Sequence, residues 1–219
     1  MKILSVSDVV ENRIYSSQAR QRFPDVDLVI SCGDLPYYYV EYMVDAFPVP
    51  VFYVRGNHAG KVEYGHNGKQ TKPEGAVNLH RRVVRTCGIT LAGFEGSINY
   101  NNKPYQYTQM QMWFFVVSML PRFLWNRIRR GSWLDILITH APSWGIQDQA
   151  DPAHRGFKAL RWLVKTIKPT VHFHGHINTY IGNRPNRTRL GNTLVINTHG
   201  YALTEIDTTA IRSSKMEHL

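Results

Sequence analysis

The sequence predicts an α/β domain built on a largely parallel β-sheet. Short apolar runs typical of buried strands lie at residues 3–7, 26–32 and 49–54. Helix-forming segments at residues 16–22 and 37–46 separate these runs. Strands that alternate with helices indicate βαβ units and therefore a parallel sheet.

The second half of the chain continues this alternation. Further strands are expected at residues 82–86, 89–92, 134–139, 170–174, 194–197 and 201–206. The glycines at Gly88 and Gly191 favour tight turns that join neighbouring strands as hairpins. A helix is expected over residues 156–168, where Phe157, Leu160, Val164 and Ile167 recur at helical spacing.

The remaining segments predict how the domain is organised. Residues 61–73 and 99–107 are polar and should form surface loops, whereas residues 107–130 should be helical. We therefore expect a single domain over residues 1–211, with a helical insertion at about 105–130 and a flexible tail at 212–219.

Length and composition exclude several classes of protein. The chain has 219 residues, and its 43% hydrophobic content supplies a sizeable core, which argues against intrinsic disorder. The longest apolar run, residues 112–117, is far shorter than the roughly 18 residues that span a bilayer. Cys32 and Cys87 cannot build a disulfide framework or a cysteine zinc site. We therefore expect a cytoplasmic protein without a transmembrane segment or a signal peptide.

The charge balance suggests an anionic partner. The formal net charge is +10. A phosphorylated small molecule, a nucleic acid or a lipid surface would each complement this charge, although it could also serve solubility alone.

Residues able to bind a metal follow several of the predicted strands. The carboxyl ends of parallel strands meet at one edge of a sheet, so we expect these side chains to converge. Carboxylate, amide oxygen and imidazole are ligands suited to Mn²⁺, Fe or Zn²⁺. The residues concerned are Asp8, Asp34, Asn57, His58, His140, His174 and His176.

In this order the motifs resemble those of the calcineurin-like metallophosphoesterase family, which reads D-x-H, G-D, G-N-H-[D/E], H and G-H-x-H. The matching segments are Asp8, Gly33-Asp34, Gly56-Asn57-His58, Thr139-His140 and Gly175-His176. The resemblance covers residues 3–200 and implies two packed mixed β-sheets flanked by helices, a four-layer sandwich.

The resemblance also implies a reaction and roles for individual residues. The family holds two divalent metals and hydrolyses phosphoesters with a metal-activated hydroxide. Asp34 matches the aspartate that bridges the metals, and Asp8 matches a ligand of the first metal. His58 matches the catalytic histidine near the leaving group. The other ligands of the second metal would be Asn57, His140 and His176.

Departures from the pattern affect the first metal. Val10 stands where the family has histidine, and Asn178 replaces the last histidine of G-H-x-H. An amide oxygen is a weaker ligand than imidazole for Zn²⁺ or Fe, so we expect a weak first site to which Asn178 contributes. Glu11 or His199 could compensate for Val10.

Several residues have a functional and a structural interpretation. His154 and Arg155 precede a predicted helix and either contact substrate or lie in a solvated loop. His174 either supports the metal ligands or is structural. Residues 183–189 are basic and would either contact nucleic acid or form a solvated loop.

These observations predict a metallophosphoesterase that uses two divalent ions of manganese, iron or zinc, with phosphodiesters slightly favoured over monoesters as substrates. One alternative is a weakly active or inactive module that binds nucleotides or other phosphorylated ligands through one metal. A further alternative is a peripheral membrane enzyme acting on a lipid-linked phosphoester, because residues 107–130 combine tryptophans with a basic end. The competing interpretation of that segment is a helix that caps the sheet.

Overall fold

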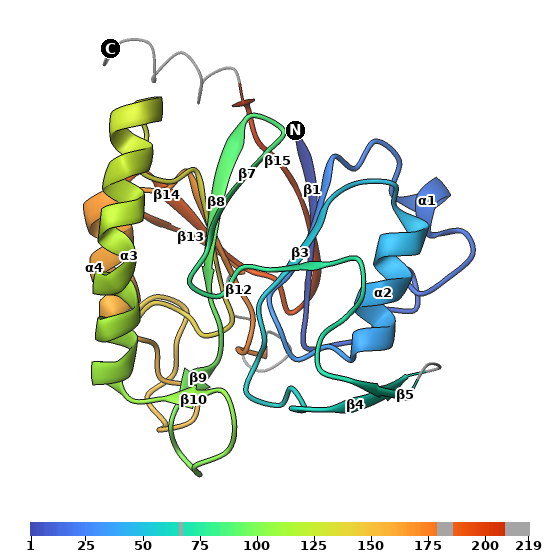
Figure 1. Ribbon diagram of the computed structural model, residues 1–219, viewed down its shortest axis with the longest axis horizontal. Coiled ribbons are helices and arrows are strands. Elements are labelled where there is room, and N and C mark those ends of the chain that lie inside the picture. Colours follow the sequence, from blue (N-terminus) through green and yellow to red (C-terminus); the bar gives the residue numbers. More distant parts are fainter. Residues whose placement is uncertain (66–67, 179–185, 209–219) are drawn as a thin grey trace.

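Two β-sheets packed face to face, with helices on the outer face of each, form the protein (Figure 1). The computed structural model describes residues 1–65, 68–178 and 186–208. Parallel and antiparallel strands occur in both sheets. The arrangement confirms the expected sandwich of two mixed sheets flanked by helices.

The first sheet has the strand order β15-β1-β2-β3-β6. All of its strands run parallel except β15, which pairs antiparallel with β1. Helices α1 and α2 cover its outer face (Figure 1). The bounds are β1 Lys2–Ser7, β2 Leu28–Ser31, β3 Val51–Tyr53, β6 Val77–Asn78, β15 Gly200–Glu205, α1 Ala19–Arg22 and α2 Tyr37–Ala46.

The second sheet has the order β13-β14-β12-β11-β8-β7. Its four central strands are parallel, and the hairpin partners β7 and β13 run antiparallel at its two edges. Helices α3 and α4 cover its outer face (Figure 1). The bounds are β7 Val83–Thr86, β8 Ile89–Phe94, β11 Ile136–Thr139, β12 Val171–His174, β13 Arg187–Leu190, β14 Thr193–Asn197, α3 Gln109–Arg130 and α4 Lys158–Ile167.

Alternation along the strands divides the apolar side chains among three layers. In β11, Ile136 and Ile138 enter the core between the two sheets, whereas Leu137 faces α3 and α4. In β1, Ile3 enters the same central core and Leu4 faces α1 and α2. A period of two with both faces apolar is expected of strands buried between layers.

The segments expected to be loops contain additional short strands. β4 (Glu63–Gly65) and β5 (Gly68–Gln70) form an antiparallel hairpin within residues 61–73, so the loop prediction is wrong there. β9 (Ser97–Ile98) pairs with β10 (Gln106–Tyr107). These strands are short, and they lack the apolar alternation that identifies a strand in a sequence.

Two of the sequence predictions fall wholly or partly outside the described residues. The tail expected at residues 212–219 lies outside them. Within the basic segment 183–189, the residues from Arg187 onward belong to the edge strand β13, which corrects the expectation of a loop for that part.

Helix α3 is defined by clear signals at both ends. Thr108 accepts a hydrogen bond from the Gln111 backbone, and the Gln111 side chain accepts one from the Thr108 backbone, which forms a capping box. Gly131 ends the helix in the left-handed conformation, with a φ of 73°. The helix continues through Pro121. None of the helices in the described part of the chain is both long and apolar enough to cross a membrane.

The packing predicts a large difference between two isoleucine truncations. Ile138→Ala removes a side chain with no exposure from the core between the sheets, and should lower the free energy of unfolding by about 2 to 5 kcal/mol. Ile128→Ala, at a position 63% exposed on α3, should change it by less than about 0.5 kcal/mol. Urea unfolding of both variants beside the wild type measures the difference, and equal losses would contradict this assignment of the core.

Candidate metal centre

The predicted site residues gather at one end of both sheets. Asp8 follows β1 and Asp34 follows β2, in the first sheet. His140 follows β11 and His176 follows β12, in the second. A hydrogen bond and an ion pair link these residues across the junction of the sheets. The carboxyl ends of the parallel strands therefore converge, as the sequence predicts.

Asp34, His140 and His176 form a candidate metal site. One ligand atom from each lies within 4.8 Å of the others. The His140 Nε2 atom lies 3.2 Å from Asp34 Oδ2, and the rings of His140 and His176 have centres 4.8 Å apart. A carboxylate and two imidazoles match the ligand preferences of Mn²⁺, Fe and Zn²⁺.

Backbone carbonyls orient both imidazoles. His140 Nδ1 lies 2.8 Å from the carbonyl oxygen of Cys32 and donates to it, which leaves Nε2 facing Asp34. His176 Nε2 lies 2.9 Å from the carbonyl of Ala153, which leaves Nδ1 as the free ring nitrogen. Such outer hydrogen bonds fix the ring orientation of metal-binding histidines. The set therefore fits a divalent metal.

Asn57 and His58 enter the site from the loop after β3. The side-chain oxygen of Asn57 lies 3.0 Å from His140 Nε2, so this amide is close enough to join the same cluster. The backbone N–H of His58 donates to Asp34 Oδ1 at 2.8 Å, while the His58 side chain is exposed. His58 therefore lies beside Asp34 in the chain fold, with its side chain at the surface.

Asp8 connects to the cluster through the backbone of His176. Its Oδ2 accepts a hydrogen bond of 2.9 Å from the His176 N–H. Asp8, Asp34 and His176 all adopt the left-handed region, with φ values of 66°, 55° and 67°. Three of the ten non-glycine residues with positive φ in the described part of the chain therefore lie at or beside this cluster.

Glycines allow the close approach of these loops. A Cβ added at Gly56 would collide with the Asp34 carboxylate, and one at Gly175 would collide with the hydroxyl of Ser7. The G-N-H and G-H motifs therefore need glycine because neighbouring side chains occupy the space that a Cβ would fill.

The neighbourhood of the expected first metal is poorer in ligands. Val10 packs against the apolar cluster beneath α2. Two residues could replace the ligand that Val10 lacks. His199 pairs with Ser7 in an isolated β-bridge, and the carboxylate of Glu11 lies against Gly200, with Oε1 2.6 Å from the position that a Cβ would take there. Within the described residues, no cluster of three potential ligands includes Asp8, Glu11 or His199. Asn178 is half-buried and is the last residue before segment 179–185.

His154 and Arg155 have different surroundings. The His154 ring centre lies 5.2 Å from that of His176, and its Nδ1 lies 2.9 Å from Asp151 Oδ1. The guanidinium of Arg155 donates to the carbonyl of Ala150 at 2.8 Å, and its side chain is exposed. Of these two residues, only His154 is directly beside the metal cluster.

Not every residue around the cluster is indicated by a sequence motif. His174 Nε2 lies 2.7 Å from Gln147 Oε1, and its Nδ1 lies 2.9 Å from the carbonyl oxygen of Gly175. Because both ring nitrogens have protein partners, these contacts support a structural role for His174. The Tyr100 hydroxyl accepts from Asn57 Nδ2 at 3.4 Å. Tyr100 follows β9 in a segment expected to be a surface loop, and no motif in the sequence marks it.

The ionisation of the cluster depends on the contact between Asp34 and His140. Burial opposes the charge of Asp34, but the charge and hydrogen bond of His140 outweigh it and lower the Asp34 pKa to about 2. Burial likewise opposes the charge of His140, but Asp34 outweighs it and raises the His140 pKa to about 9. Burial, followed by the charge of His140, lowers the pKa of His176 to about 3.

The metal-free protein should therefore contain a protonated His140 at neutral pH. In Asp34→Asn the charge partner is lost and burial dominates, so the His140 pKa should fall below its ordinary value of 6.5. NMR titration of the histidine ring carbons after chelator treatment measures both values. A His140 resonance that titrates near 6.5 in both proteins would contradict the ion pair.

Comparison with known proteins agrees with the motifs and the geometry. The family model for calcineurin-like phosphoesterases matches residues 1–180. No curated protein matches the sequence.

Solved structures show the same fold. One is TT1561 of Thermus thermophilus, with 16% identity, a TM-score of 0.63 and coverage of 95% of each chain. A second solved structure has 17% identity, the same TM-score of 0.63 and coverage of 95% of each chain. At sequence identities this low, the similarity to these two structures shows a shared fold and nothing about function. Since the family model covers most of the sequence, the chain belongs to the calcineurin-like phosphoesterase family.

Proposed function

We propose that this protein is a metal-dependent phosphodiesterase whose metal ligands are Asp34, Asn57, His140 and His176. The observation that carries the proposal is the buried Asp34–His140 pair with an exposed histidine, His58, directly beside it. Manganese is the metal we expect to support activity. A divalent ion in such a site supplies Lewis acidity, which acidifies water and neutralises charge on phosphoryl oxygens.

The protein's own residues prepare the site for this chemistry. Asp34 stays ionised over the physiological range because its pKa is about 2. The Cys32 carbonyl holds the Nδ1 proton of His140, so Nε2 is the atom that exchanges a proton for a metal. His58 is anchored through its backbone N–H, which leaves its imidazole free to donate a proton to the leaving oxygen.

The surroundings support a diester over a monoester. A phosphodiester carries one negative charge, whereas a monoester carries close to two at neutral pH. The guanidinium of Arg155, the other candidate for substrate contact, donates to the Ala150 carbonyl. His176, as a proposed metal ligand, is neutral when it binds the ion and so adds no positive charge for the substrate. His154, beside His176, remains the proposed substrate contact.

The proposal has a direct test in hydrolysis assays with Mn²⁺. The wild type should cleave bis-p-nitrophenyl phosphate faster than p-nitrophenyl phosphate, with a rate that rises with Mn²⁺, and Asp34→Ala should abolish turnover. His58→Gln keeps the backbone N–H that binds Asp34. On a diester with an alkyl leaving group it should lower kcat by about 10²- to 10⁴-fold, because that leaving group needs a proton.

The same variant provides its own control. p-Nitrophenolate leaves without help, so His58→Gln should lose much less activity on bis-p-nitrophenyl phosphate. An equal loss of kcat on both diesters would contradict the role of His58 as proton donor, while the proposed metal-dependent activity would still stand.

Metal content tests the expected weakness of the first site, which we assign to Asp8, Asp34 and Asn178. After extensive dialysis the wild type should retain close to one ion per chain, because Val10 supplies no ligand. Val10→His restores the D-x-H pattern and should raise retention toward two. Full retention of two ions by the wild type would contradict the weak site.

A second candidate function is a binding module with one metal and little or no turnover. The packing of Val10 in an apolar cluster favours it, because one bound ion cannot contact both the attacking and the leaving oxygen as two can. A protein that holds Mn²⁺ and a nucleotide but hydrolyses neither ester at millimolar Mn²⁺ would establish this function.

The free thiols Cys32 and Cys87 are consistent with a reducing compartment, and we propose the cytoplasm as the location.

A further inference from the structure

Helix α3 has two apolar faces, and only one of them enters the core. The buried face consists of Met112, Val116, Met119 and Phe123, each with no exposure. The opposite face carries an exposed set at helical spacing, which we name the outer stripe. It comprises Met110, Phe114, Val117, Leu124 and Ile128, with exposed fractions from 47% to 76%.

The outer stripe is long and continuous. It extends from Met110 to Ile128, which is about 27 Å at 1.5 Å per residue. Pro121, also exposed, occupies the same face between Val117 and Leu124. Single exposed apolar side chains are ordinary, but a contiguous stripe marks an interaction surface.

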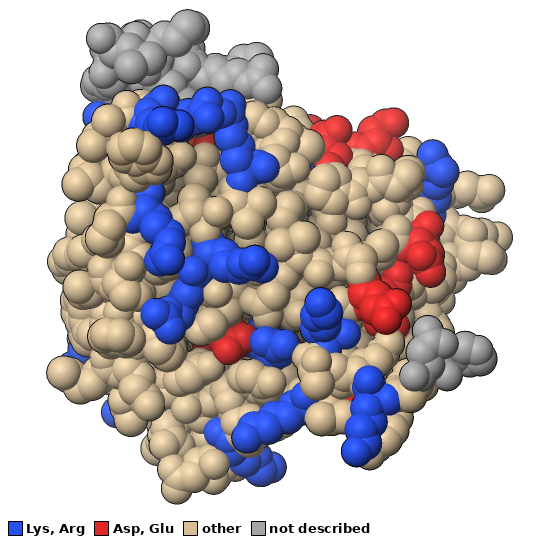
Figure 2. Space-filling view, viewed as in Figure 1, with Lys and Arg blue, Asp and Glu red and all other residues tan. Residues whose placement is uncertain are grey.

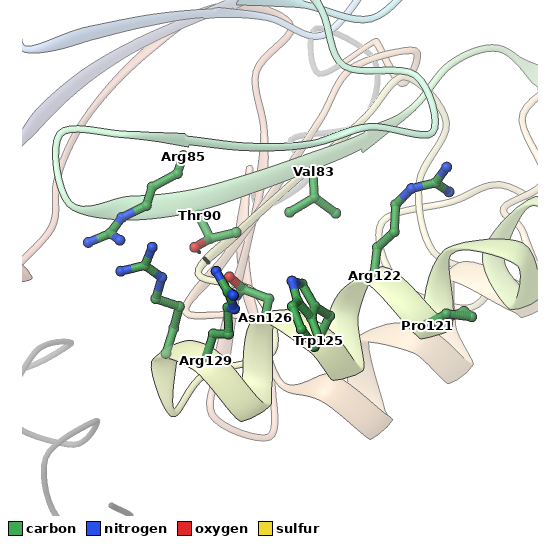
Figure 3. Close-up of a pocket in the computed structure, with 9 residues that line it drawn as sticks. Val83, Arg85, Thr90, Pro121, Arg122, Trp125, Asn126 and Arg129 are labelled. Atoms are coloured by element: carbon green, nitrogen blue, oxygen red, sulfur yellow. Dashed lines mark hydrogen bonds between the residues drawn. The ribbon is translucent and has the colours of Figure 1, made fainter.

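A basic pocket adjoins the stripe at the C-terminal end of α3. Its cavity of about 500 Å³ lies between the helix and the β7–β8 hairpin. We name its charged and aromatic lining the arginine pocket. The residues are Arg85 from β7 and Arg122, Trp125, Arg129 and Arg130 from α3 (Figure 3).

The geometry of the pocket suits an anionic headgroup. The Arg129 guanidinium lies 4.6 Å from the centre of the Trp125 ring, which is 58% exposed. Asn126 donates to the carbonyl of Ser132 at 2.8 Å and so fixes the end of the helix beneath these side chains. Arginine beside an exposed tryptophan is typical of surfaces that sit at a membrane interface.

The pocket is separate from the metal centre. Thr90, which lines it, lies at the start of β8, whereas His140 follows the end of the parallel strand β11. The two places are therefore at opposite ends of the second sheet.

Charge on this side of the molecule complements an anionic surface. Helix α3 contains no Asp or Glu, and its last turn carries Arg127, Arg129 and Arg130. Figure 2 shows Lys and Arg gathered over the half of this face that contains α3 and the β7–β8 hairpin, with most visible Asp and Glu on the other half. Basic groups near an anionic membrane attract it at short range.

We propose that α3 docks this protein on an anionic phospholipid bilayer. The outer stripe enters the boundary between headgroups and acyl chains, and the arginine pocket binds lipid phosphates. A bilayer is favoured over a protein groove because the exposed side chains lie along one face of a helix and arginines adjoin them at its C-terminal end. The long stem of arginine lets apolar neighbours enter the boundary region while the guanidinium stays among the headgroups.

Two variants and two matched controls test the proposal by cosedimentation with vesicles. The stripe variant is Phe114→Gln/Leu124→Gln/Ile128→Gln, and its control is Val62→Gln/Tyr64→Gln, at positions 43% and 78% exposed near or on β4. The arginine variant is Arg129→Gln/Arg130→Gln, and its control is Arg20→Gln/Arg22→Gln on α1. Thermal unfolding checks that all four proteins are folded.

The wild type should bind vesicles containing phosphatidylserine and bind phosphatidylcholine vesicles much more weakly. The arginine variant should bind the anionic vesicles about 25-fold more weakly, from roughly 1 kcal/mol per arginine. The stripe variant should lose about tenfold or more, because its apolar groups no longer enter the bilayer. The control variants should bind as the wild type does.

Several outcomes would overturn the proposal. The proposal is wrong if the wild type does not bind anionic vesicles. It is also wrong if the control variants lose as much binding as the stripe and arginine variants. A loss confined to the arginine variant would indicate a pocket for soluble anions. Self-association that the stripe variant abolishes, without vesicle binding, would assign the stripe to a protein contact.

Discussion

The contact between Asp34 and His140 is the interaction on which the site depends. Asp34 comes from the end of β2 in the first sheet and His140 from the end of β11 in the second, and their side chains meet at 3.2 Å. Both are almost fully buried, with side-chain exposures of 8% and 0%. A buried charge needs a partner, so each residue fixes the ionisation of the other.

The other site contacts cross the same junction. Asn57 from the first sheet reaches His140 in the second, and the His176 backbone in the second reaches Asp8 in the first. The two sheets must therefore pack in one register before the cluster exists. The isoleucines between them supply the apolar burial that holds this register, while the glycines of the motifs let the loops approach. The same packing of the two sheets therefore determines both the fold and the geometry of the site.

Much of this arrangement can be predicted from the residues. Apolar runs locate the central strands, and the motif residues at the ends of these strands identify Asp34, His140 and His176 as members of one cluster. The apolar runs and the motifs are local features of the sequence, because the end of a strand and the glycine turn that follows it involve adjacent residues. The position of Arg155 cannot be predicted in this way, since its partner is a backbone carbonyl.

Other features depend on contacts between distant segments. The carbonyls of Cys32 and Ala153 orient two imidazoles, and a backbone atom carries no sequence signal. Tyr100 reaches Asn57 only because its loop folds over the site. Helix α3 is apolar on both faces, so periodicity alone cannot say which face is core. The strands β4 and β5 lack apolar alternation, so their sequence is typical of a loop.

The most direct measurement for the central claim is the position of bound manganese in crystals grown with Mn²⁺, located by anomalous scattering. The account predicts an ion in contact with the Asp34 carboxylate and His140 Nε2, with the His140–Cys32 hydrogen bond retained. Crystals in which Asp34 and His140 still contact each other directly, with manganese bound elsewhere or absent at saturating concentration, would contradict it.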